Sequence, residues 1–157
     1  MEGNSIKVPL SARCMRLISP VVLSLLPALP VLGANWPGWR GDGSGISPEK
    51  NLAIAWTATE NVLWNTPLPG EGNSSPVVWR ERIFLTASSE GGKKRIVLCL
   101  DAKDGRILWQ RPLDAARSPR ADPKNGYASP TPVTDGTNVY VFFDSPGVVA
   151  LEGGLLW

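Results

Sequence analysis

The chain has 157 residues, of which 43% are hydrophobic and 19% are charged, with a formal net charge of +2 and no histidine. This apolar content excludes a disordered polymer. The absence of histidine excludes a His general base, a Ser-His or Cys-His nucleophile pair, and a His-ligated zinc or haem within this sequence. The 16 Gly and 15 Pro favour many turns over a helix bundle.

Residues 1–34 have the pattern of a secretory signal peptide. Three basic side chains come first, from Lys7, Arg13 and Arg16. An uncharged apolar run over 17–32 follows, broken by prolines and too short to span a bilayer securely, and it ends in the small residues Gly33 and Ala34. We therefore predict export to the periplasm or out of the cell, with cleavage after Gly33 or Ala34. An uncleaved membrane anchor is the alternative.

Removal of this leader changes the charge and the cysteine content. Residues 35–157 hold 13 basic and 13 acidic side chains, so they are neutral and give no electrostatic basis for binding nucleic acid. Contact with a membrane is expected only through the leader during export. Cys14 leaves with the leader, so Cys99 remains as a lone thiol and no internal disulfide forms. We interpret Cys99 as a small core residue of a strand.

Tryptophan marks a sequence repeat. Trp64, Trp109 and Trp157 are 45 and 48 residues apart. Residues 62–68 align without gaps on residues 107–113, and a third copy ends at Trp157. A second register has a constant offset of 56 and aligns 75–78 and 83–85 on 131–134 and 139–141. Such self-similarity predicts an array of like units.

Short runs rich in Val, Ile, Phe and Tyr, separated by turn residues, predict four strands in each unit. The expected strands are 74–79, 82–88, 95–101 and 106–112 in the first unit, and 131–134, 138–144, 148–152 and 154–157 in the second. Four strands in each of several repeated units are typical of β-propeller blades. The predicted fold is all-β: a partial β-propeller of about two four-stranded antiparallel blades, over 61–113 and 128–157. A β-sandwich is the alternative.

Residues 61–68 match the fourth strand of a blade but precede the first unit. We expect them to be an N-terminal closing strand, which completes the last blade of a ring. Two units cannot form the roughly four to eight blades of a ring. We therefore interpret the sequence as the N-terminal fragment of a longer propeller, with an N-terminal segment over 35–60 before the repeats of 61–157. The uncovered face and edges of the last blade predict association.

Residues 99–109 resemble the tryptophan-docking motif of the pyrroloquinoline-quinone-like (PQQ-like) propeller repeats. In that family the pattern runs Ala, x, Asp, x, x, Thr, Gly, three residues and Trp. This sequence matches it at Asp101, Gly105 and Trp109. It departs from it at Cys99, which replaces Ala, and Asp104, which replaces Thr. A second copy with a shorter hairpin consists of Ala150, Glu152, Gly153 and Trp157. The opening residues 35–41 are similar to exported bacterial members.

The motif also has a physical interpretation. Gly105 can adopt the positive φ that ends a tight hairpin, and the Asp101 carboxylate can accept backbone N–H groups across that turn. Trp109, on the outer strand, is large enough to bridge one sheet and the next. We interpret the repeat residues as structural staples between blades rather than as cofactor contacts: Trp64, Asp101, Gly105, Trp109, Gly153 and Trp157.

The resemblance implies which groups a catalytic member of this superfamily would need. Its quinone-dependent dehydrogenases bind pyrroloquinoline quinone and a calcium ion in the central channel, with an Asp as base. The groups that do so come from several blades. The present sequence has no paired carboxylates or adjacent cysteines of that kind. We therefore predict no catalytic and no metal-ligating residue here, and the cofactor-binding residues are unknown.

The longest connection, residues 114–130, is the predicted partner-binding loop. Long ordered loops on rigid folds often carry binding, and an inter-blade linker is the alternative. The side chains expected to contact a partner are Arg117, Arg120, Lys124 and Tyr127. The run Lys93-Lys94-Arg95 is interpreted as a solvated charge cluster at a hairpin tip.

Taken as a PQQ-like repeat protein, the chain is expected to be an exported, non-catalytic binding or scaffold domain for protein or small-ligand partners. The alternative is a fragment of a pyrroloquinoline-quinone-dependent dehydrogenase. The quinone enters only through the family resemblance.

Overall fold

The computed structural model describes residues 33–50, 52–117 and 124–152. All of them fall within one compact unit, and their structure is all-β. The strands are β1 (Val77–Trp79), β2 (Arg82–Ser89), β3 (Lys94–Asp101), β4 (Ile107–Asp114), β5 (Val133–Thr134), β6 (Asn138–Phe142) and β7 (Val148–Glu152), with a 3-10 turn, η1 (Glu90–Gly92), between β2 and β3. Within the described ranges, no helix has the length and apolarity that crossing a membrane requires.

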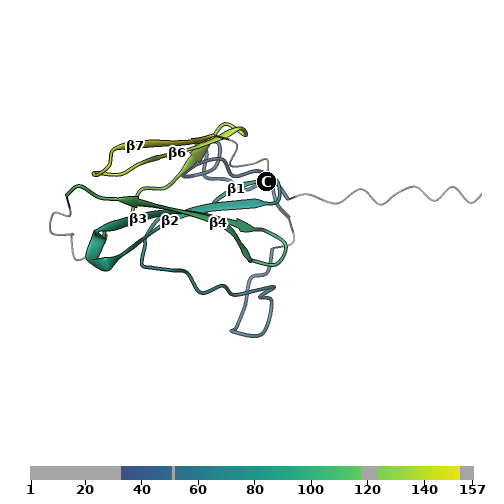
Figure 1. Ribbon diagram of the computed structural model, residues 1–157. Helices are drawn as coiled ribbons and strands as arrows, with labels where there is room; N and C mark the ends of the chain where they lie inside the picture. The colour runs from purple at the N-terminus through teal and green to yellow at the C-terminus, as the bar shows by residue number, and fades with distance from the viewer. Residues whose placement is uncertain (1–32, 51, 118–123, 153–157) are drawn as a thin grey trace, which may run out of the picture. The chain divides into compact units, whose positions relative to one another are not determined.

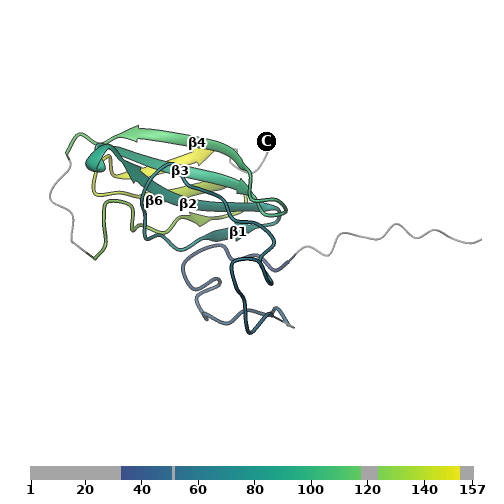
Figure 2. The same ribbon diagram turned by 90° about the horizontal axis from the view of Figure 1, so that it is seen from below.

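The strands form two antiparallel sheets. The first sheet has the order β1-β2-β3-β4 and the second has the order β5-β6-β7. Figure 1 shows the second sheet in yellow next to the teal and green first sheet, and Figure 2 shows the strands of the first sheet side by side. Within each sheet, every strand pairs with the strand next to it in the sequence, which is the meander expected of a propeller blade.

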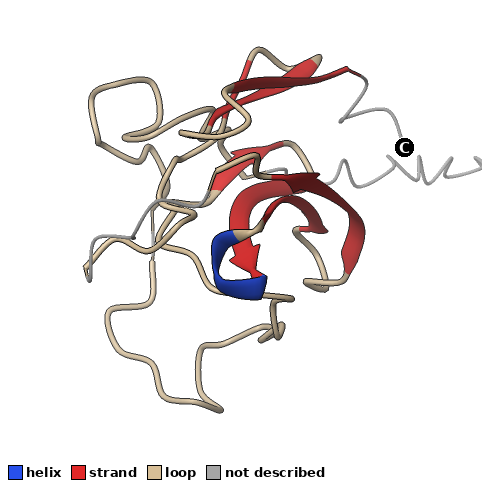
Figure 3. Ribbon diagram, turned by 60° about the vertical axis from the view of Figure 1, so that its left-hand side comes forward, coloured by secondary structure: helices blue, strands red, loops and turns tan. Residues whose placement is uncertain are grey.

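Within the described residues, hairpins join the strands expected in each unit. Trp79 pairs with Arg82, which leaves Arg80 and Glu81 as a two-residue turn with a positive φ of 53° at Arg80. Figure 3 shows the strands in red and η1 in blue, with long loops between them. β1 and β5 are shorter than expected and β6 ends two residues before the expected 144. The expected strand 154–157 lies outside the described residues.

A shared core holds the two sheets together. Residues of both sheets contribute to one buried cluster: Val77, Phe84, Val97, Cys99, Val139, Val141 and Phe143. We call the sides of the sheets that meet in this cluster their inner faces. The prediction that Cys99 is a core residue is confirmed, because it is fully buried there. Packing of apolar faces is therefore what joins the two repeats.

The outer face of the first sheet is buried as well. Ala87, Ile96, Leu98 and Leu100 form a second cluster there, bordered by Ile83, Leu85 and Ile107. β3 is thus covered on both faces, and residues 95–100 are all buried. The sequence of a strand covered on both faces is a continuous apolar run rather than an alternation of apolar and polar residues. This explains why every residue of Ile96–Leu100 is apolar.

The expected closing strand at 61–68 is not a strand in the structure. The segment runs over the outer face of the first sheet without joining a sheet. Two side-chain hydrogen bonds, from Trp64 and Thr66, attach it instead to the turn between β3 and β4. Residues 62–68 have the sequence pattern of β4. A segment becomes a strand only when it pairs with the edge of another strand, and no described strand pairs with this segment.

Candidate functional site

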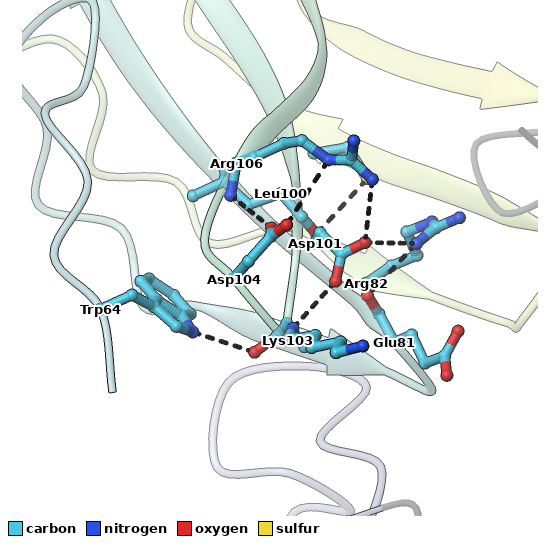
Figure 4. Close-up of polar contacts among 10 residues, drawn as sticks. Trp64, Glu81, Arg82, Leu100, Asp101, Lys103, Asp104 and Arg106 are labelled. Atoms are coloured by element: carbon cyan, nitrogen blue, oxygen red, sulfur yellow. Dashed lines mark hydrogen bonds and ion pairs between the residues drawn. The ribbon is translucent and has the colours of Figure 1, made fainter. Parts of the chain in front are cut away.

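The turn between β3 and β4 is built around Asp101 and Gly105. The Gly105 amide donates to the Asp101 carbonyl at 2.9 Å, and Gly105 has a φ of 73°. Oδ1 of Asp101 accepts from the Lys103 amide at 2.9 Å, and Oδ1 of Asp104 accepts from the Arg106 amide at 3.0 Å. Figure 4 shows the contacts of the Asp101 and Asp104 side chains. Both carboxylates shape the turn, as the sequence motif predicts for Asp101.

Two arginines also face the Asp101 carboxylate. Arg82 Nη1 and Arg106 Nη2 each lie 3.7 Å from its Oδ2 atom. Asp101 is therefore engaged by the backbone through one oxygen and by guanidinium groups through the other (Figure 4). These contacts hold the Asp101 side chain in place within the turn.

Trp64 docks on this turn. Its Nε1 atom donates to the Ala102 carbonyl at 3.0 Å, and the neighbouring Thr66 hydroxyl donates to the Gly105 carbonyl at 2.7 Å. The indole lies so close to Gly105 that an added Cβ would come within 2.3 Å of its Cε3 atom. A glycine is required here both by φ and by this contact.

Trp109 has a different environment from Trp64. It packs against the core between the sheets, with its ring centroid 6.1 Å from that of Phe84, and the Arg111 guanidinium lies 5.5 Å from its ring. Among the described tryptophans of the motif, Trp64 is thus the one seen docked on a glycine turn. Gly153 and Trp157, the other predicted staple residues, lie outside the described residues.

An apolar pocket of about 500 Å³ lies between residues 56–68 and the outer face of the first sheet. Its lining comprises Trp56, Thr57, Ala58, Val62, Trp64, Asn65, Thr66, Leu68, Pro76, Ile83, Leu85 and Leu100. None of these side chains is ionisable. The pocket therefore has the chemistry of an apolar binding site with a few neutral hydrogen-bonding groups at one side.

Sequence reasoning missed this pocket. A partial signal is Trp56, which lines the pocket and alternates with Leu52 and Ile54 outside it; the three side chains are exposed by 70, 63 and 97%. Alternation of this kind is typical of one apolar face of an extended segment. It belongs to the stretch assigned only as an N-terminal segment.

The predicted partner loop is described only in part. Arg117 and Lys124 are exposed, and Arg120 lies outside the described residues. Tyr127 packs inward, with its ring 5.0 Å from the Arg95 guanidinium and against Gly92. Tyr127 is thus part of the packing between the loop and the first sheet.

Arg95 overturns the interpretation of Lys93-Lys94-Arg95 as a solvated cluster. Its side chain is fully buried, and Nη2 lies 3.0 Å from Oδ1 of Asp144 in the loop after β6. It also donates to the Gly92 carbonyl, while its Nε has no hydrogen-bond partner. Alternation along β3 turns Arg95 to the inner face, where Tyr127 and the loop after β6 contact it. The pair ties the two sheets together.

Neither the apolar pocket nor the β3–β4 turn has the groups that would hold pyrroloquinoline quinone. The quinone carries three carboxylates and, in its enzymes, is held with a calcium ion, which takes oxygen ligands. The pocket offers no cationic side chain, and no group of three acidic or cysteine side chains lies together within the described ranges. The carboxylates of the β3–β4 turn are taken up by arginines and backbone amides.

Two antiparallel meanders that share an inter-sheet core, with a tryptophan docked on a glycine turn, define a protein of the β-propeller repeat class. Comparison with family models agrees. Residues 31–157 match the model described as outer membrane protein assembly factor BamB, and the chain belongs to this family of PQQ-like repeat proteins. Comparisons with curated proteins and with solved structures gave no match.

Proposed function

We propose that this chain is an exported, non-catalytic binding protein that holds protein or small apolar partners at the pocket between residues 56–68 and the first sheet. The observation that carries the proposal is the chemistry of that pocket. Trp56, Val62 and Leu68 line it and remain exposed by 70, 39 and 40%. Exposed apolar surface gathered around a concave site is typical of partner binding.

The electrostatics support binding rather than catalysis at this site. Acid–base catalysis needs a titratable group within hydrogen-bond reach of the substrate, and the pocket lining has none. The one thiol in the described part, Cys99, is buried away from the pocket lining, and burial raises its pKa to about 12. Export is proposed on the leader pattern of residues 1–34.

Binding to the pocket is tested with anilinonaphthalene sulfonate, a dye that fluoresces on apolar surfaces. Dye emission is measured with the full chain and with its Trp56→Glu variant, each at the lowest protein concentration that gives a readable signal. We expect Trp56→Glu to lower the emission several-fold. The matched control is Ile54→Glu, because Ile54 is equally apolar and 97% exposed but does not line the pocket. Equal emission from all three would overturn the pocket as the binding site.

The purified full chain also tests the alternative that the protein is a fragment of a dehydrogenase. Pyrroloquinoline quinone is added with calcium, and absorbance and dye-linked alcohol oxidation are recorded. We expect neither a calcium-dependent spectral shift nor activity. A saturable shift would make the chain a quinone-binding domain and contradict a non-catalytic role.

A further inference from the structure

The connection between β4 and β5 contains an Asn-Gly pair, Asn125-Gly126. The side-chain carbon Cγ of an asparagine and the next backbone nitrogen can close a five-membered ring, with loss of ammonia. Glycine leaves that nitrogen unshielded because it has no Cβ. This chemistry is one reason that asparagine counts as a thermolabile residue. Whether it proceeds in a folded protein depends on how the two groups are held.

Three Asp-Gly pairs of the same chain, which can close the same ring with loss of water, serve as a comparison. In all three, the fold already uses the glycine amide as a hydrogen-bond donor. The Gly43 amide donates to the Arg40 carbonyl at 3.0 Å, the Gly105 amide to the Asp101 carbonyl at 2.9 Å, and the Gly136 amide to the Thr134 hydroxyl at 3.1 Å.

The three carboxylates are engaged as well. Each accepts at least one backbone amide in its own turn: Asp42 from Ser44 at 2.9 Å, Asp104 from Arg106 at 3.0 Å, and Asp135 from Thr137 and Asn138 at 2.8 and 2.7 Å. Ring closure would break these bonds together with the bond of the glycine amide. The folded structure therefore protects all three Asp-Gly pairs.

Asn125-Gly126 is held differently. Both residues are exposed. Within the described part of the chain, neither the Asn125 side chain nor the Gly126 amide forms a hydrogen bond. A Cβ built on Gly126 would meet no atom closer than Oδ1 of Asn73, at 3.4 Å. The attacking nitrogen is thus free of hydrogen bonds and uncrowded, and the carbon that it would attack is open to water.

We propose that Asn125 is a site of spontaneous deamidation in the folded protein, with water as the co-reactant. The Gly126 nitrogen gives its proton to solvent and bonds to Cγ of Asn125. The bond from Cγ to the side-chain nitrogen breaks, and that nitrogen takes a proton from solvent and leaves as ammonia. Water then adds to either carbonyl of the ring and opens it, which yields aspartate or isoaspartate without any oxidant or reductant.

The reaction alters the chain directly before an anchor of this loop. Tyr127 follows the pair, and its ring lies 5.0 Å from the buried Arg95 guanidinium. The next residue, Ala128, is fully buried, and its carbonyl accepts from the Asn73 amide at 2.9 Å. Isoaspartate adds one carbon atom to the main chain at residue 125, and the carbonyl there that accepts from the Ser129 hydroxyl becomes part of a free carboxylate. We therefore expect isoaspartate to loosen Tyr127 over Arg95.

Isotope labelling tests the site. The full chain is kept in mildly alkaline water labelled with heavy oxygen, once folded and once in guanidinium chloride, and is then digested in ordinary water for mass spectrometry. Opening of each ring installs one heavy oxygen, so the label reports Asn-Gly and Asp-Gly pairs alike. We expect residue 125 to react within about threefold of its unfolded rate, and the three Asp-Gly pairs to react at least about tenfold more slowly than when unfolded. Protection of Asn125 equal to that of the Asp-Gly pairs would overturn the proposal.

Two variants test the chemistry. Asn125→Gln keeps an amide but requires a larger ring, and Gly126→Ala places a Cβ beside the attacking nitrogen. Both should lower the labelling of residue 125 in the folded chain at least about tenfold. The matched control is Gly91→Ala, which changes another exposed glycine of positive φ, 61° against 58° at Gly126, and should label like the parent. Equal labelling of Gly126→Ala and the parent would contradict attack by this nitrogen.

Melting tests the consequence for the loop. The isoaspartate form is separated from the aged chain by chromatography and compared with Asn125→Asp, which has the new charge but a main chain of normal length. We expect the isoaspartate form to melt about 2–5 °C lower than Asn125→Asp. Equal melting temperatures would overturn the loosening of Tyr127.

Discussion

The indole of Trp64 lies against the α-carbon of Gly105, so closely that no side chain fits between them. This contact fixes residues 61–68 over the outer face of the first sheet, and it is reinforced by the hydrogen bond from Trp64 to Ala102. The pocket wall on that side therefore depends on one glycine.

Gly105→Ala should destabilise the protein by both strain and a clash. The added Cβ meets the Trp64 ring, and the φ of 73° disfavours any L-side chain. Gly91→Ala is the matched control, because Gly91 has a φ of 61° but open space around it. We expect about 1 kcal/mol lost from the free energy of unfolding in Gly91→Ala and about 2–4 kcal/mol in Gly105→Ala. Urea denaturation measures both, and equal losses would show that the indole contact is unimportant.

Asp144→Ala should leave Arg95 as a buried charge without its carboxylate partner. Breaking a buried ion pair from one side is costly, and since Asp144 is half exposed we expect a loss of about 1–3 kcal/mol. In an Arg95→Met background the same change should cost clearly less. A double-mutant cycle measured by denaturation gives the coupling. Additive losses would indicate that the two side chains do not interact.

Cys99 should be inert to thiol reagents in the folded protein. Desolvation by burial is the main cause that raises its pKa to about 12, with a smaller contribution from Asp101 and an opposing one from Arg82. Because the thiolate is the reactive form, a Cys14→Ser chain should not react with Ellman's reagent at pH 8. It should release one equivalent of thiol in guanidinium chloride. Rapid reaction under native conditions would contradict the buried position.

Asp135 should make the turn between β5 and β6 sensitive to acid. Its Oδ1 accepts from the amides of Asn138 and Thr137 at 2.7 and 2.8 Å, and its Oδ2 accepts from the Tyr140 hydroxyl at 2.9 Å. These bonds, that to Asn138 first, lower its pKa from 3.8 to about 2.

A carboxyl with a lowered folded pKa stabilises the protein above its ordinary pKa and ceases to do so as pH falls toward the folded value. The melting temperature of the parent should therefore fall more steeply between about pH 4 and pH 2 than that of Asp135→Asn. Circular dichroism melts across this range measure the difference. Parallel curves would show that the Asp135 contacts do not form in solution.

Much of the sheet structure could be predicted because its determinants are local. β-branched and aromatic runs and turn residues such as Asp104-Gly105 set the strands and hairpins near the predicted positions. The segment 61–68 shows the limit of this reasoning. Its residues match β4 one for one, but a strand also needs a partner edge, and the sequence of the segment does not contain that partner.

The site was predictable to a smaller extent. Asp101 and Gly105 form the turn that the motif indicated. Arg95 and Tyr127 were interpreted as surface groups, because the residues that enclose Arg95 come from elsewhere in the chain. The pocket joins Trp56 to Leu85 and Leu100, and such a juxtaposition follows from chain path rather than from any motif.

The first described residues would also constrain the order of events in the export that we propose. The Asn35 side chain accepts a hydrogen bond from the Arg80 amide at 2.7 Å, and Trp36 exchanges two backbone hydrogen bonds with Val78. A peptidase that cuts after Gly33 or Ala34 needs the chain extended in its cleft within one or two residues of this anchor. The proposed leader removal would therefore have to precede the docking of Trp36 on β1, and a mutation that speeds folding of this edge should then slow maturation.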